Sequence, residues 1–135
     1  MRKLAEGFIP HWAGVAADPQ NPEVEAGRKY TETGKIVFTK TLSGSKWTNT
    51  TLASGDITYE VNSLKRKEGG DIIAYGGATF ASSLIKNNLI DEYHLFINSA
   101  ALGSGLPIFK QRTNLKLKSS QTFDCRIVVL VFTPL

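Results

Sequence analysis

Two adjacent glycines separate a strand-like run from a helix-like run near the middle of the chain. Asp71-Ile-Ile-Ala-Tyr75 has the composition of a buried strand, Gly76 and Gly77 follow at once, and 79–87 has helical spacing. Glycines let the backbone approach a ligand closely, and the N–H groups and dipole of a helix start attract an anion. The turn therefore favours a phosphate or pyrophosphate. The alternative is a simple tight turn, since the pattern is neither GxGxxG nor a P-loop.

A second polar cluster, Thr39-Lys40-Thr41, follows the strand-like run 35–39 directly. A cation between two hydroxyls at the carboxyl end of a parallel strand suits the 2′-phosphate that distinguishes NADP from NAD. A plain solvated turn is the other interpretation.

Two cations, Arg2 and Lys3, stand at the start of the first predicted helix. Positive charges at this end oppose the helix dipole, and a bound anion would relieve that arrangement. The alternative is a frayed terminus.

The remaining reactive residue types favour structural roles. Cys125 is the single cysteine, which excludes an internal disulfide, and His11 and His94 are too far apart in sequence to indicate a metal site. We expect Cys125 to be a structural thiol in a turn and His94 to be a strand residue near the surface. The pair Asp91-Glu92 is more simply a turn than an acid–base pair. Trp12 and Trp47 are expected to be core or rim aromatics.

The elements that position these residues alternate between helix and strand. Leu4, Phe8 and Trp12 mark one helical face, Pro10 is expected to end or kink that helix, and a loop is predicted over 13–23. The other predicted elements are a helix over 22–31, strands over 35–39 and around 51–52, a helix capped by Asp56, strands over 71–75 and 93–98, a helix over 79–87 and two final strands over 115–123 and 126–133. This order predicts an α/β protein whose sheet is parallel in its middle and mixed at its end.

Length and composition limit the possible classes. The 135 residues are one domain's worth, with 41% hydrophobic and 21% charged residues, which excludes a disordered tail, a collagen-like repeat and a coiled coil. The net charge of +4 is well short of a dedicated nucleic-acid binder but suits an anionic small molecule. No apolar run reaches the roughly 18 residues that span a membrane, and the N-terminus lacks the apolar core of a signal peptide. We expect a cytoplasmic protein.

Three motifs in order carry a family resemblance. They are Tyr75 to Phe80, Asp91 to Phe96 and Leu102 to Phe109. With them the chain resembles the reductase family typified by the C-terminal domain of the bacterial bifunctional riboflavin-biosynthesis enzyme. The resemblance implies a dihydrofolate reductase-like fold, a three-layer mixed sheet flanked by helices, over the single domain 1–135.

That resemblance also implies a cofactor, NADPH, and the residues that bind it. The family's helix-start motif matches Arg2 and Lys3 but not the residues on either side of them, and its hydroxyl-cation-hydroxyl-Leu motif matches Thr39, Lys40, Thr41 and Leu42 in full. Its Gly-Gly turn matches Gly76, Gly77, Ala78, Thr79 and Phe80 in full. The resemblance implies that Lys40 faces the 2′-phosphate and that the Gly76 to Phe80 turn holds the pyrophosphate.

The implied activity is hydride transfer to a pyrimidine or pteridine-like substrate, as in 5-amino-6-(5-phosphoribosylamino)uracil reductase or dihydrofolate reductase. The alternative is an inactive nucleotide-binding or assembly module of the same fold, and a weak nucleic-acid binder is a third, less favoured class.

The chain departs from the family at its start. In the family, further strands and a helix precede the Arg-Lys helix and line the substrate pocket, so we expect an N-terminally truncated domain and assign no catalytic residue. Open sheet edges expose unpaired backbone groups. We therefore expect a second copy of the chain to cover the edge, in a homodimer.

Overall fold

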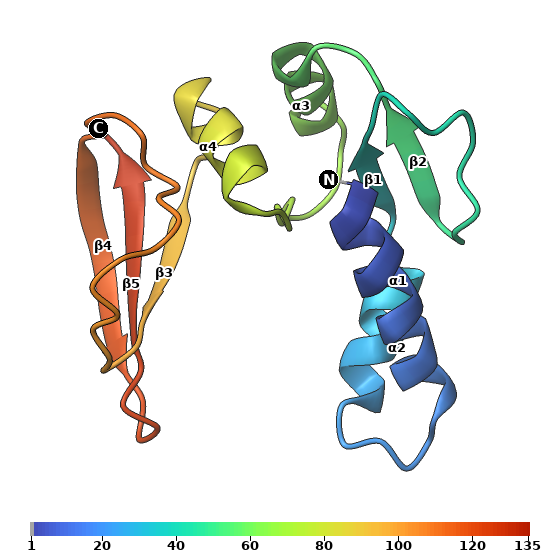
Figure 1. Ribbon diagram of the computed structural model, residues 1–135, viewed down its shortest axis with the longest axis horizontal. Helices are drawn as coiled ribbons and strands as arrows, with labels where there is room; N and C mark the ends of the chain where they lie inside the picture. Colours follow the sequence, from blue (N-terminus) through green and yellow to red (C-terminus); the bar gives the residue numbers. More distant parts are fainter. Residues whose placement is uncertain (1) are drawn as a thin grey trace. The chain divides into compact units, whose positions relative to one another are not determined.

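A computed structural model describes residues 2–135, leaving aside the side chain of Arg2. In chain order the elements are α1 (Arg2–Ala17), α2 (Val24–Glu32), β1 (Lys35–Phe38), β2 (Thr50–Ala53), α3 (Ile57–Lys65), α4 (Ala78–Lys86), β3 (Tyr93–Ile97), β4 (Leu115–Thr122) and β5 (Val128–Pro134) (Figure 1). They form two compact units, residues 1–70 and 71–135. Within the described residues, no helix combines the length and hydropathy needed to cross a membrane.

Close contact between α1 and α2 organises the first unit. Gly27 of α2 is buried against α1, and a Cβ atom there would lie 2.7 Å from the backbone nitrogen of Ala16. On the same pair of helices the Trp12 and Tyr30 rings are in contact, with centroids 4.6 Å apart and planes tilted by 35°, and Phe8 meets Tyr30 edge-on at 5.5 Å. The packing of α1 against α2 therefore leaves no room for a side chain at position 27.

The first helix is longer than predicted. It runs through Pro10 to Ala17, so the expected end near Pro10 and the loop from 13 were wrong. Proline removes one backbone donor from the helix, but Phe8 and Trp12, on either side of it, both contact Tyr30. Tertiary packing thus overrides the local signal.

Polar side chains fix both ends of α2. At its start Asn21 Oδ1 accepts a hydrogen bond from the Glu23 backbone N–H at 2.9 Å, although the helix begins at Val24 and not at Pro22 as predicted. At its end the Lys35 ammonium donates to the carbonyls of Tyr30 (3.0 Å), Thr31 (3.0 Å) and Thr33 (2.7 Å). These bonds satisfy carbonyls that have no partner within the helix.

The first sheet confirms the predicted parallel pairing. β1 and β2 pair from Lys35 with Thr50 to Phe38 with Ala53, and Val37 and Ala53 are buried. The predicted cap of α3 is also confirmed, because the Asp56 carboxylate accepts from the Tyr59 backbone N–H at 2.9 Å.

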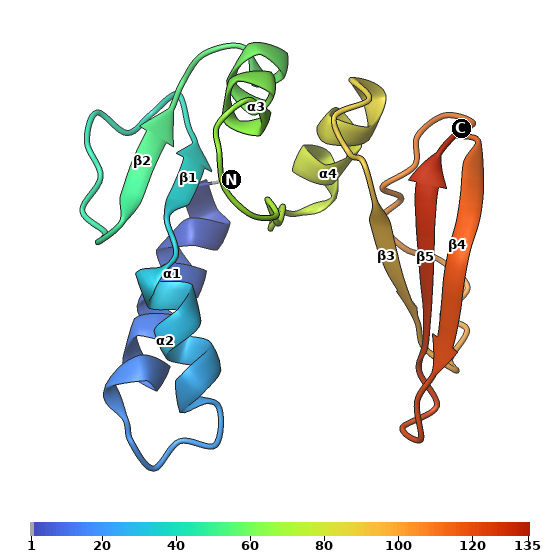
Figure 2. The ribbon, with the colours of Figure 1, turned by 180° about the vertical axis from the view of Figure 1, so that it is seen from behind.

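The second unit is α4 with an antiparallel sheet of order β3-β5-β4. The three strands and their hairpin confirm the predicted antiparallel ending. Its core is the cluster of buried apolar side chains Leu84, Ile85, Leu89, Tyr93 and Val129. Figure 2 shows the same elements from behind.

One predicted strand is absent from the described structure. Residues 71–77 are irregular, and Ile72 and Ile73 are 58% and 69% exposed. A strand is completed by a hydrogen-bonded neighbour, and the strands that the structure describes are joined in two sheets that leave this segment out. The predicted α/β class is confirmed, but the parallel and antiparallel pairings that we expected in one mixed sheet lie in two sheets of the described structure, β1-β2 and β3-β5-β4.

Two glycine substitutions test the α1–α2 contact. Gly27→Ala should lower the free energy of unfolding by about 1–3 kcal/mol, because the new methyl meets backbone that cannot move aside. Gly14→Ala, in open space on α1, should raise it by about 0.5–1 kcal/mol through helix propensity. Urea unfolding followed by circular dichroism measures both. A change of the same sign in both variants would contradict the packing.

Candidate functional site

The turn after β1 is organised by a buried hydroxyl. Thr39 is 8% exposed, and its backbone N–H donates to the Ala53 carbonyl at 2.9 Å, which extends the β1–β2 pairing by one residue. Its Oγ1 accepts from the Thr41 backbone N–H at 3.2 Å and lies 3.4 Å from Thr41 Oγ1. Thr39 therefore shapes the turn from inside.

The rest of this motif lies at the surface. Lys40 and Thr41 are exposed, and Leu42 is half-buried. Among the ion pairs of the described residues, none includes Lys40. An exposed ammonium beside a hydroxyl, on a turn fixed by Thr39, is chemically suited to a phosphate monoester.

The start of α1 adds positive charge to the same unit. Lys3 is exposed in the first helical turn, which holds no acidic residue, and the Arg2 side chain lies outside the described residues. Figures 1 and 2 both place this start of α1 beside β1.

The Gly-Gly turn of the second unit forms the start of α4. Gly77 is its N-cap, and the Gly77 carbonyl accepts from the backbone N–H groups of Phe80 (3.0 Å) and Ala81 (3.1 Å). Glycine has no side chain to cap the helix, and the N–H groups of Ala78 and Thr79 precede the first helical bond. This is the arrangement that binds an anion at a helix start.

The two glycines differ in what surrounds them. A Cβ atom on Gly76 would lie 2.5 Å from Cδ1 of the Phe80 ring, so the ring occupies that space. A Cβ atom on Gly77 would meet nothing within 4 Å. Gly76 is thus explained by packing inside the protein, and Gly77 leaves open space next to the helix start.

The residues predicted to bind the cofactor form two local motifs, one in each unit. Lys3 and the Thr39 to Leu42 turn belong to the first unit, and Gly76 to Phe80 belong to the second. That both motifs hold one cofactor stays a prediction.

Sequence reasoning missed the role of Ser82 in the second unit. This side chain is 8% exposed, and its Oγ donates to the Ile108 carbonyl at 2.7 Å, while the Phe109 ring lies 5.7 Å from that of Tyr93. Both contacts hold the loop motif Leu102 to Phe109 against α4 and β3. The signal was available, because a serine on the apolar face of a helix needs a partner.

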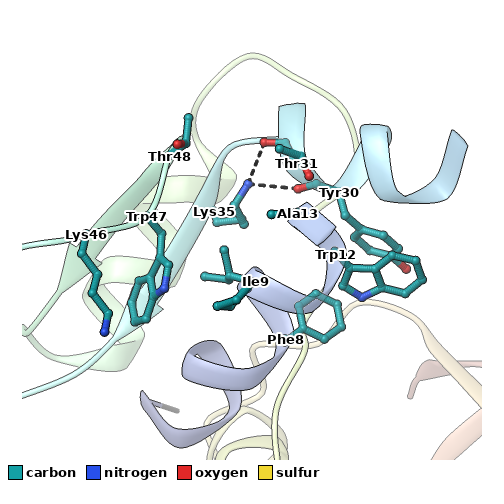
Figure 3. A pocket seen from close by; sticks show the side chains of 11 residues that line it. Phe8, Ile9, Trp12, Ala13, Tyr30, Thr31, Lys35, Lys46, Trp47 and Thr48 are labelled. Carbon is teal, nitrogen blue, oxygen red and sulfur yellow. Dashed lines mark hydrogen bonds between the residues drawn. The ribbon is translucent and has the colours of Figure 1, made fainter. Parts of the chain in front are cut away.

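Sequence reasoning also missed a pocket of about 210 Å³ in the first unit. Trp12 and Trp47, expected in the core or at its rim, are half-buried and both line it (Figure 3).

The acidic pair before β3 lies in a surface charge cluster. Glu92 contacts His94 Nε2 at 2.7 Å and Lys118 Nζ at 2.5 Å, and both contacts lower the pKa of Glu92. His94 is exposed, as expected, and so is Cys125 in the hairpin turn.

Comparison with known proteins adds a family and a fold. The family described as the RibD C-terminal domain matches residues 15–129. Two uncharacterized proteins of Bacillus subtilis strain 168 are similar to the chain: YyaP is 42% identical over 80 residues, and YwjB is 36% identical over 63 residues. The matches cover 57% and 44% of this chain, but only 43% and 36% of those proteins, so the chain spans less than half the length of either relative.

A solved structure matches the fold. The crystal structure of a protein from Shewanella sp. PV-4, provisionally assigned to riboflavin biosynthesis, superposes with a TM-score of 0.65 at 17% identity. The match covers 77% of this chain and 62% of that one. At this identity the likeness establishes a shared fold, which is dihydrofolate reductase-like.

The two adjacent glycines give a prediction about stability. Gly76→Ala should lower the free energy of unfolding by about 1–2 kcal/mol, because the methyl displaces the Phe80 ring. Gly77→Ala should lower it by less, about 0.5 kcal/mol, because the methyl enters open space and only the poorer capping by alanine destabilises the helix. Thermal unfolding by circular dichroism compares them. Equal losses would show that the two positions are not distinct.

Proposed function

The chain belongs to the RibD C-terminal domain family, and from that premise we propose that it is an NADPH-dependent reductase. The substrate class is a pyrimidine or pteridine-like heterocycle, as for 5-amino-6-(5-phosphoribosylamino)uracil in riboflavin biosynthesis. NADPH, when bound, supplies the hydride. A cytoplasmic location belongs to the same proposal.

One observation carries the proposal, namely the start of α4. The N–H groups of Ala78 and Thr79 follow a glycine that offers no capping side chain, and the position of its missing Cβ faces open space. A pyrophosphate placed there accepts hydrogen bonds from the backbone and meets the positive end of the helix dipole. The residues present fit the diphosphate of a dinucleotide.

The turn after β1 supports the choice of NADPH over NADH. The buried Thr39 hydroxyl accepts a hydrogen bond from the Thr41 backbone N–H and so holds Thr41 in place. Lys40 remains exposed between these two residues. In the proposed complex Lys40 pairs with the 2′-phosphate, and Thr41 donates its hydroxyl. Lys3, and Arg2 by its position in the same helical turn, add positive charge.

Two substitutions test the 2′-phosphate contact and the pyrophosphate contact of the cofactor separately. Lys40→Gln should weaken NADPH binding about five- to tenfold and leave NADH binding unchanged, because only NADPH carries the 2′-phosphate. Gly77→Asp should weaken both cofactors, because a carboxylate would occupy the space of the pyrophosphate. Titrations followed by cofactor fluorescence measure all four affinities.

The control for these titrations is Lys67→Gln, which removes an exposed cation just beyond the end of α3. It should leave both affinities unchanged. No NADPH binding by the unmodified chain would contradict the reductase proposal, and binding without turnover of any pyrimidine or pteridine would favour the nucleotide-binding module.

Association into a homodimer is a further part of the proposal. Apolar side chains on the second sheet are exposed, among them Phe96 (64%) and Leu117 (52%). Light scattering measures the mass in solution, and a monomer at micromolar concentration would exclude a stable dimer.

A further inference from the structure

The pocket of the first unit lies at the opposite end of β1 from the proposed 2′-phosphate turn. It is lined from the middle of α1, the end of α2, Lys35 at the start of β1 and the segment 46–48 before β2. Strands rise about 3.3 Å per residue, so Lys35 and Thr39 are about 13 Å apart along β1. The pocket is therefore separate from the turn that is proposed to bind NADPH.

Aromatic rings give the pocket its walls. Figure 3 shows Trp47 on one side, Phe8 and Trp12 on the other, and Ile9 between them. The Trp12 ring is held by its contact with the Tyr30 ring, whose centroid lies 4.6 Å away. Flat apolar surfaces of this kind favour a planar ring.

The charge of the lining favours an anion. Its residues include two lysines, Lys35 and Lys46, and no aspartate or glutamate. The Lys35 ammonium donates its three N–H groups to three backbone carbonyls, and partial burial lowers the pKa of Lys35. Lys46 is exposed, lies 5.7 Å from the Trp47 ring centroid and, among the described residues, forms no ion pair. Lys46 is therefore the cation that a ligand can reach.

We propose that this pocket binds a small planar aromatic carboxylate, with its ring against Trp47 and its carboxylate on Lys46. The volume of about 210 Å³ is below the range of about 300–1,000 Å³ of drug-sized ligand pockets, which limits the ligand to one ring or two fused rings. The proposal does not depend on the reductase activity, since it uses none of the residues assigned to NADPH.

Nuclear magnetic resonance of the full chain labelled with ¹⁵N tests the proposal. The sequence has two tryptophans, and both line the pocket, so the two indole N–H signals report on it directly. Titration with 2-naphthoate should shift the Trp47 signal strongly and the Trp12 signal detectably, and both shifts should saturate. Naphthoate should bind equally in the presence of saturating NADPH.

Two comparison compounds isolate the charge and the ring. The amide 2-naphthamide keeps the ring and loses the charge, and cyclohexanecarboxylate keeps the charge and loses the planar ring. Both should bind more weakly than naphthoate. Shifts that do not saturate, or equal affinity for naphthoate and its amide, would overturn the proposal.

Variants locate the binding site. Lys46→Gln should weaken naphthoate binding about three- to fivefold, which is the scale of one exposed ion pair, and Lys67→Gln should have no effect. Trp47→Leu should weaken it about tenfold or more through lost stacking, with the Trp12 signal and circular dichroism showing that the fold is kept. Unchanged affinity in Lys46→Gln would overturn the assignment of the carboxylate to Lys46.

Discussion

The carbonyls at the end of α2 need hydrogen-bond donors, and one ammonium group supplies three of them. Lys35 reaches back from the first residue of β1 to Tyr30, Thr31 and Thr33, while its own backbone N–H donates to the Asn49 carbonyl at 2.7 Å. Asn49 donates its side-chain amide to the carbonyls of Thr31 and Glu32. The same two residues thus join the end of a helix to the start of the parallel sheet, and Lys35 also lines the aromatic pocket.

Local signals in the sequence predicted most of the elements. The first strand (predicted over 35–39, found at Lys35–Phe38), the Asp56 cap and the final hairpin each depend on neighbouring residues, and the structure has all three. The errors at Pro10 and at 71–75 have one cause. Whether a helix continues past a proline, or an apolar run becomes a strand, is decided by partners distant in the sequence, and a local pattern does not contain them.

For the candidate site, too, the sequence predicted the local motifs but not the contacts that their residues make in the fold. Motif matching found the Gly-Gly turn and the Thr-Lys-Thr turn, but it treated all their residues as ligand contacts. The structure divides them: Thr39 and Gly76 serve the protein's own packing, while Lys40 and Gly77 face open space. The aromatic pocket was missed because its walls come from segments up to 40 residues apart, Phe8 and Thr48 among them.

The placement of both tryptophans in the first unit has a consequence for any optical study of the chain. Residues 71–135 contain no tryptophan, so the intrinsic emission excited at long wavelength comes entirely from residues 1–70. Tryptophan emission therefore reports the unfolding of residues 1–70, whereas far-ultraviolet dichroism also detects the antiparallel sheet of residues 71–135. Coincident transitions would show that the two units unfold together, and separate transitions would show that they unfold independently.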